Sequence, residues 1–410
     1  TPREVSGGFY LTRLDHLLDP TRIYKLKTSD FERINPNTKT CPVFRTSQDA
    51  MLTTQIYRQC KVLINDATRE NIWHIKFARM FDMSNDSHLF YTYSQLVDKG
   101  AKLEGNKFLL NNQFYVPLYE GKMIWHYNHH FGTINEGTKE KPARQMAMPT
   151  SDELKNPNHN IMPWYWIPKE DMDNRLIKTD AKGNIIWEWS HKWLIGFRDI
   201  TNATHDRTFV ISLIPDACGV GNSATLLFVE RGTMPGALLL GMMSSLVFDY
   251  ATRQKIGGSH ASISFVKQFP VLTPEQVSSS GYEQDIVERV ARLCWFNHDL
   301  DGWMEELREE CPEEYDLPEE PVIWDEEQRT VWQAELDAIF AHLYGLTTED
   351  LRYILDPEDV CGKGCINETF RVLKERELRE LGEYRTKRLV MEAWNKFEFD
   401  NKLKMLCYEK

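Results

Sequence analysis

The stretch from 248 to 274 combines side chains that can bind an anion with a backbone that can approach one closely. Two adjacent glycines near its centre allow a sharp turn and leave room for a ligand against the main chain. Cationic and hydroxyl side chains on both sides of the glycines suit the phosphates of a nucleic acid. The predicted DNA-contacting residues of this stretch are Arg253, Lys255, Gly257, Gly258, Ser259 and His260.

A second cluster of polar and aromatic residues lies between Tyr115 and Phe131. One interpretation places Lys122, His126 and His129 on a DNA-facing surface, with aromatic side chains interleaved between them. The other interpretation puts the aromatic residues in the core and gives the histidines buried hydrogen bonds. The sequence favours neither of these two interpretations.

The same histidines raise the question of zinc, for which imidazole nitrogens are common ligands. Histidines stand at 126, 129 and 130, but no cysteine or further histidine follows them at the spacing of a zinc site. The pair Cys361 and Cys365 lacks the second pair that a zinc site of this kind needs. We therefore predict no metal ligands in this chain.

Two further patterns do not meet the requirements of the chemistry that they suggest. The glycine-rich run at 219–223 lacks the Gly-Lys-Ser/Thr ending of a phosphate-binding P-loop. Asp216 and Glu230 have the spacing of nuclease acids, yet Arg231 and Gly232 follow where a Glu-x-Lys pattern is needed beside a metal. We therefore predict neither a P-loop nor a nuclease site.

Several separated stretches resemble the C-terminal target-recognition region of large adenine-specific DNA methyltransferases. These enzymes belong to bacterial restriction–modification and phage-defence systems of the type IIG or DISARM kind. The similarity extends over about residues 8–396. The stretches that carry it are Asn35–Arg45, Phe77–Phe90, Tyr115–Phe131, Trp193–Thr204, Phe248–Pro274, Phe370–Glu375 and Glu383–Arg388.

The resemblance implies a module that recognises double-stranded DNA while a separate domain flips and methylates an adenine. It adds Arg198, in the stretch that ends at Thr204, to the predicted DNA contacts. The chain departs from the family pattern at Asn128 and His130, where an acid and then an arginine are usual. This departure weakens a charge-based role for those two positions.

The catalytic part of such an enzyme is missing from this sequence. The segment 35–37 reads Asn-Pro-Asn and lacks the second proline and the aromatic residue that hold a flipped adenine. A Phe-x-Gly-x-Gly cofactor loop is absent as well. We therefore predict no catalytic residue and no cofactor here, and we expect S-adenosylmethionine to bind the missing methyltransferase domain.

Composition is that of a folded globular protein, with 41% hydrophobic and 12% aromatic residues among 410. The segment 299–360 contains 21 acidic and 3 basic residues, a charge of −18, so the rest of the chain is +6 within the total of −12.

Eight scattered cysteines predict reduced thiols and a cytoplasmic protein. The longest apolar run, Ala237–Phe248, is too short to cross a bilayer.

We expect an α+β fold, with a mixed α/β target-recognition domain followed by a mainly helical C-terminal domain. Helical spacing predicts a helix over 47–57, the apolar segment 235–250 predicts one helix, and the turn at 182–184 predicts a hairpin between 176–179 and 185–189. Residues 1–30 are predicted to come from the end of a methyltransferase domain, 31–280 to form the recognition domain, and 281–410 the helical domain. An alternative function is a docking scaffold, in which the acidic segment 299–360 binds a helicase or nuclease subunit of a defence complex.

Overall fold

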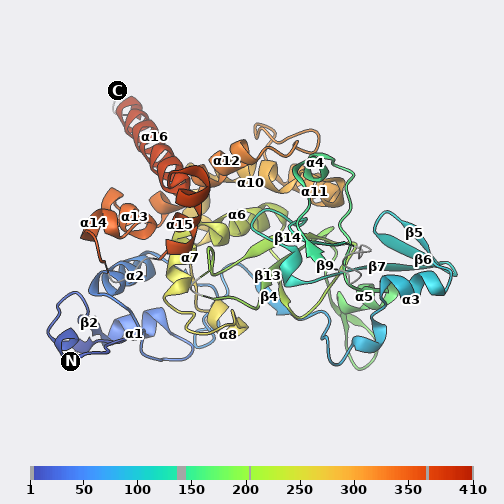
Figure 1. Cartoon of the computed structure of the whole chain (residues 1–410), viewed down its shortest axis with the longest axis horizontal. Coiled ribbons are helices and arrows are strands. Elements are labelled where there is room, and N and C mark those ends of the chain that lie inside the picture. The colour runs from blue at the N-terminus through green and yellow to red at the C-terminus, as the bar shows by residue number, and fades with distance from the viewer. Residues whose placement is uncertain (1–3, 136–144, 203–204, 366–368, 409–410) are drawn as a thin grey trace.

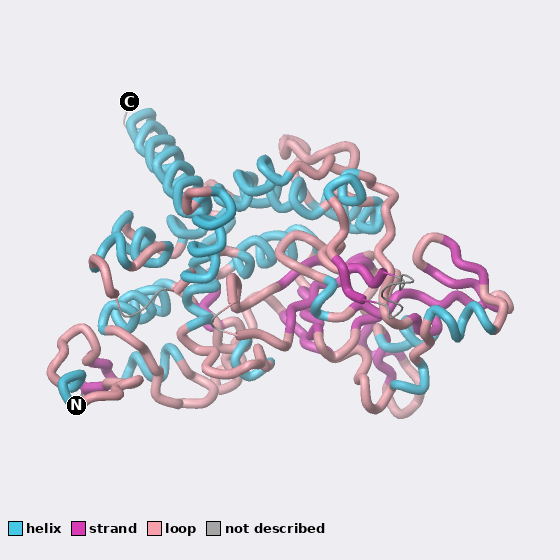
Figure 2. The backbone as a smooth tube through the Cα atoms, in the orientation of Figure 1, coloured by secondary structure: helices cyan, strands magenta, loops and turns pink. Residues whose placement is uncertain are grey.

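The computed structural model describes residues 4–135, 145–202, 205–365 and 369–408, with side chains described as far as residue 398. Helices and small, mostly antiparallel sheets alternate along the chain, which confirms the predicted α+β class. In Figure 2 the helices of the C-terminal third lie along one side of the molecule, and most strands lie on the other.

The central sheet has the strand order β14-β13-β16-β4, and every neighbouring pair is antiparallel. Its middle strands are almost wholly buried, because α6 (Thr233–Ser244) packs on β14 and β16. Strands buried on both faces read as continuous apolar runs, as these do. The strands are β4 (Ile75–Ala78), β13 (Trp193–Arg198), β14 (Ile211–Pro215) and β16 (Ala224–Val229).

A second sheet has the order β10-β7-β6-β5, and β15 pairs with β7 in parallel. A separate hairpin joins β11 and β12 through the turn at 182–184, as the sequence predicted. The strands are β5 (Lys102–Glu104), β6 (Lys107–Leu110), β7 (Gln113–Tyr119), β10 (Trp166–Pro168), β15 (Gly219–Val220), β11 (Ile177–Thr179) and β12 (Ile185–Glu188). Smaller pairs are β1 (Glu4–Gly7) with β2 (Tyr24–Lys27), β8 (Thr133–Asn135) with β9 (Gln145–Ala147), and β17 (Pro270–Val271) with β3 (Lys61–Val62).

The apolar run that follows the central sheet forms two helices rather than the single helix that its composition predicts. Helix α6 ends at Ser244, and α7 (Leu246–Arg253) continues after a bend of 61°. Ser245 causes the break, because its hydroxyl accepts a hydrogen bond from Phe248 N and so caps α7. Within the described ranges, no single helix is long and apolar enough to span a bilayer; α6 and α7 meet that criterion only as this bent pair.

The C-terminal third is a layer of helices that covers α6. In Figure 1, α6 lies between this layer and the central sheet. The long helices are α10 (Glu283–Cys294), α11 (Asp301–Glu310), α12 (Glu326–Leu343), α13 (Thr348–Leu355), α15 (Arg371–Leu381) and α16 (Arg385–Tyr408). Helices elsewhere in the chain are α1 (Thr28–Ile34), α2 (Ser47–Gln59), α3 (Tyr93–Asp98), α4 (Ser151–Lys155), α5 (Lys169–Arg175), α8 (Ile263–Val266), α9 (Pro274–Ser278) and α14 (Glu358–Cys361).

One cluster of buried apolar residues extends from Leu52 to Phe397 and includes both the central sheet and the helical layer. A small separate cluster lies under β2 and α2. The boundary predicted at residue 280 therefore marks a change of secondary structure inside one core. The helical layer supports the sheet directly, and the sheet in turn positions the loops described next.

Candidate nucleic-acid interface

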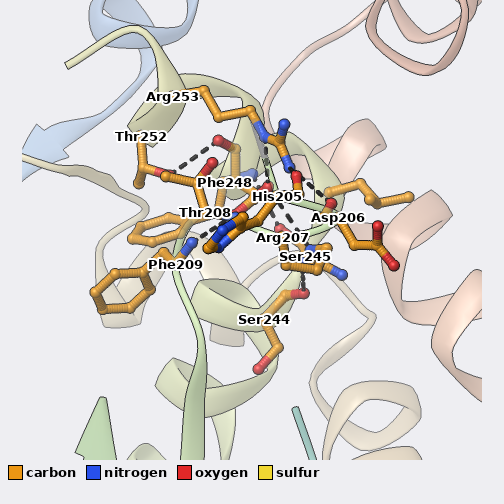
Figure 3. Close-up of polar contacts among 12 residues, drawn as sticks. His205, Asp206, Arg207, Thr208, Phe209, Ser244, Ser245, Phe248, Thr252 and Arg253 are labelled. Carbon is orange, nitrogen blue, oxygen red and sulfur yellow. Dashed lines mark hydrogen bonds and ion pairs between the residues drawn. The ribbon is translucent and has the colours of Figure 1, made fainter. Parts of the chain in front are cut away.

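A buried carboxylate, Asp249 on α7, organises the backbone beside the predicted contact loop. Figure 3 shows Arg253 of α7 and the segment 205–209 that lies against it. Its Oδ1 accepts hydrogen bonds from the main-chain N–H groups of Thr208 at 2.8 Å and Phe209 at 2.7 Å. Its Oδ2 accepts a hydrogen bond from Arg253 Nε at 2.9 Å. Asp249 thereby fixes the segment that leads into β14 against the end of α7.

Arg253, a predicted phosphate contact, makes its hydrogen bonds to other parts of the chain. Its side chain is 5% exposed, and besides Asp249 it donates to the carbonyl oxygens of His205 at 2.7 Å and Asp206 at 2.6 Å. The guanidinium also lies 4.6 Å from the ring of Phe370. The structure therefore gives Arg253 the role of a clamp between α7 and the segment at 205–206, not that of a surface cation.

Lys255 is partly buried. Its Nζ donates to the carbonyl oxygens of Ile34 and Gln268, and lies 4.9 Å from the ring of Tyr57. Burial lowers the pKa of Lys255 well below its ordinary value. Lys255 therefore holds two loops together and is not placed to reach a phosphate.

These loops carry two of the stretches that resemble the methyltransferase family. The side-chain Oε1 of Gln268 accepts hydrogen bonds from Asn37 N at 3.1 Å and Thr38 N at 3.4 Å. Asn37 in turn donates through Nδ2 to the carbonyl oxygen of Ile64 at 2.9 Å. A cavity of about 290 Å³ lies between the segments 34–44 and 254–268. Two distant parts of the sequence thus form one surface.

The loop at 257–260 is the exposed part of this surface. A side chain added at Gly257 or Gly258 would meet nothing within 4 Å, so the space above both glycines is open. The main-chain N–H groups of this loop donate to no described residue; they belong to Gly257, Gly258, Ser259 and His260. All four residues are exposed, so these donors are open to an acceptor outside the chain.

The same loop is held firmly at its far end. His260 Nδ1 lies 2.8 Å from Asp199 Oδ2, Thr201 N donates to Ser259 O at 2.9 Å, and Ala261 N donates to Asp199 O at 2.7 Å. These contacts fix His260 beside the exit of β13. Because Asp199 occupies Nδ1, the Nε2 atom of this exposed imidazole is left for an outside partner.

The three contacts predicted outside this loop have different environments. Arg198 donates to the carbonyl oxygens of Gly121 and Ile124, and burial lowers its pKa to about 10. His126 is 3% exposed, and desolvation followed by the charges of nearby arginines keeps its pKa well below the usual range. Lys122 alone of these three reaches solvent, 2.9 Å from Glu120 and above the ring of Trp164.

Sequence reasoning missed a hollow of about 280 Å³ beside the loop. It is lined by residues that include Trp125, Ile200 and His205, and the Ile200 side chain is 63% exposed. Arg79 lies 3.9 Å from Asp199 at the same edge and is half exposed. Ile200 stands two residues after the buried strand β13, and an apolar residue just past a strand was the signal in the sequence. The last residues of that matching stretch, 203–204, lie outside the described residues.

The sequence predicted no metal ligands, but the structure brings three side chains that can bind a metal close together. His129 and His130 lie together with Asp299, a residue far away in the sequence, whereas His126 is not part of the group. Burial, and after it the charges of His130 and Arg329, lower the pKa of His129 well below its ordinary value. A neutral imidazole is the form that binds metals.

In comparisons with known proteins, no family model and no curated protein matches the chain. The resemblance described from the sequence therefore rests on its own motifs.

Proposed function

We propose that this chain is the DNA target-recognition module of an adenine-specific DNA methyltransferase from a bacterial restriction–modification or phage-defence system. The observation that carries the proposal is the exposed loop at 257–260, with open space above its glycines and main-chain N–H donors that bond to no described residue. Main-chain N–H groups and hydroxyls are common partners of DNA phosphates, where they set the register of the protein on the duplex.

In this proposal the surface loop binds and the buried cations position it. The DNA contacts are Gly257, Gly258, Ser259 and His260, with Lys122 at the edge. Arg253 and Lys255 hold the loop from below through the contacts described above. Arg198 and His126 belong to the support as well, because neither side chain is free at the surface.

Chemistry on the adenine then falls to a domain outside this chain, which supplies S-adenosylmethionine. Recognition of a duplex before base flipping needs a platform that fixes the DNA backbone while the target base leaves the stack. A loop with short side chains and pinned ends suits that task, since the DNA backbone can come close and the loop loses little freedom on binding.

A charge placed on the loop tests the proposal. Ser259→Glu puts a carboxylate among these main-chain donors and should weaken binding to a random-sequence duplex at least about tenfold, because the carboxylate repels the phosphates. The measurement is fluorescence anisotropy of labelled duplex DNA at low salt.

Ser94→Glu is the matched control, because it makes the same change at an exposed position on α3, far from α8 in Figure 1. Its affinity for DNA should equal that of the unaltered chain. Equal weakening in both variants, or none in either, would contradict the proposed contact surface. Absence of DNA binding by the unaltered chain would instead favour the docking-scaffold alternative.

A further inference from the structure

We infer that His129, His130 and Asp299 form a binding site for one divalent transition-metal ion. This inference goes beyond DNA recognition and does not depend on it. One ring nitrogen of each histidine and one carboxylate oxygen of Asp299 all lie within 4.8 Å of one another. His130 Nε2 is already 2.9 Å from Asp299 Oδ2, and the two imidazole rings have centroids 4.3 Å apart.

Buried atoms without partners point to a ligand at this place. His129 is 1% exposed, and no described residue is placed to accept from or donate to its Nε2. The Nδ1 atom of His130 is in the same situation, with the whole residue 0% exposed. Buried polar groups are normally hydrogen-bonded, so an unpartnered ring nitrogen in the interior suits a bound ion or water.

Side-chain amides hold the ligands in position from both sides. Asn128 Oδ1 accepts a hydrogen bond from His130 N at 2.8 Å, and Asn297 Oδ1 accepts one from Asp299 N at 2.9 Å. Asn297 also donates through Nδ2 to the carbonyl oxygen of His159 at 2.9 Å. Groups that orient the ligands in this way are a regular feature of metal sites.

His159 is available as a further ligand. Its ring centroid is 6.1 Å from that of His130, and its buried Nε2 has no partner among the described side chains and backbone. The hydrogen bond from His298 N to Pro157 O, at 3.0 Å, holds the 157–160 segment against the turn that carries Asp299.

The chemistry of the donors selects the class of metal. Two imidazoles and one carboxylate suit zinc, cobalt or ferrous iron, whereas magnesium and calcium prefer oxygen ligands alone. The Asp299 side chain is 27% exposed and lines a cavity of about 330 Å³ with Asp216, Glu305 and Lys107. This cavity gives an ion a route to the site and leaves room for water on its open side.

Cobalt titration of the chelator-treated chain tests the site directly. We expect one equivalent of Co²⁺ to bind, with visible absorption bands of low coordination number, and Zn²⁺ to displace it. Asp299→Asn and His129→Gln should each weaken Co²⁺ binding at least tenfold, with unchanged far-ultraviolet circular dichroism. Asp301→Asn is the matched control, because Asp301 pairs with His298 at 3.0 Å nearby but outside the cluster, and it should bind cobalt normally.

A thiol site is the rival explanation, because Cys361 and Cys365 lie close together. Cys361→Ser should leave cobalt binding unchanged, and no ultraviolet thiolate-to-cobalt band should develop. The inference is overturned by any of three results: no stoichiometric binding, full binding by both Asp299→Asn and His129→Gln, or loss of binding in Cys361→Ser.

Discussion

At the scale of single residues, the difference between a surface cation and a buried one decides what this chain can contact. Arg253, Lys255 and Arg198 all donate to main-chain carbonyl oxygens, so their charges organise loops instead of meeting a ligand. Their sequence environment is the same in either case, because burial depends on what packs against them from distant segments. The exposed glycines at 257 and 258 were predictable, since Gly-Gly beside polar residues is a loop signal on its own.

The same lesson holds for the histidines between 126 and 130. The sequence left a surface role and a core role equally open, and the structure places all three in the interior. Spacing along the chain could not reveal the possible metal site of His129, His130 and Asp299, because the carboxylate comes from a distant part of the sequence. Ligand sets assembled from distant segments have no local sequence signature.

Asp337 provides a residue-scale test of burial through pH. Desolvation raises its pKa to about 7, although it accepts a hydrogen bond from Leu246 N at 2.7 Å. The folded state therefore holds this proton more tightly than the unfolded state does, and the stability that Asp337 contributes is lost as pH rises from about 4 to about 7.

Asp337→Asn removes that titration and keeps an acceptor for Leu246 N. The free energy of unfolding of the unaltered chain, relative to this variant, should fall by up to about 4 kcal/mol across that pH range. Urea unfolding at several pH values measures it, with the exposed Glu313→Gln as control. A difference between Asp337→Asn and the unaltered chain that does not change with pH would contradict the account.

At the scale of elements, the sequence correctly predicted one helix and one hairpin from their regular patterns, but it missed the break that divides the apolar helix in two. The helical spacing from Ser47 to Tyr57 predicted α2, and the turn at 182–184 predicted the hairpin of β11 and β12. The apolar segment 235–250 predicted one helix, because nothing in its hydrophobic pattern marks a break. Ser245 caps the second helix locally, and Asp337 on α12 accepts a hydrogen bond from Leu246 N, the first N–H of that helix.

Removing the cap at this bend should destabilise the fold. Ser245→Ala eliminates the acceptor for Phe248 N and the donor to Met242 O, both of which are buried. The expected loss is about 1–2 kcal/mol in the free energy of unfolding. Ser279→Ala, at an exposed helix end, should change stability by less than about 0.5 kcal/mol. Equal stability of the two variants in a urea titration would rule out Ser245 as the cause of the bend.

At the scale of the whole molecule, one core joins the sheet region to the C-terminal helices. Gly241 on α6 illustrates how closely they pack, since a side chain there would lie 3.1 Å from Val290 on α10. Arg329 on α12 donates to Tyr127 O at 3.0 Å and so connects the helical layer to the histidine segment. A change of composition at residue 280 could not show this, because core sharing depends on packing between layers.

Truncation after residue 280 is expected to unfold the remainder. It would expose the face of α6 that α10 covers, leaving a large apolar surface in water. The shortened chain should bind a hydrophobic dye and show no cooperative thermal transition by circular dichroism. A sharp transition in the 1–280 chain, near that of the full chain, would show that the predicted recognition domain folds alone.

The central claim is that this chain binds DNA through the loop at 257–260. The most direct measurement is its affinity for a random-sequence duplex over a series of salt concentrations. The account predicts a linear fall of log affinity with log salt, at about 0.9 per phosphate neutralised, and weaker binding by His260→Ala across the series. Affinity that does not depend on salt, or no binding at the lowest salt, would contradict it.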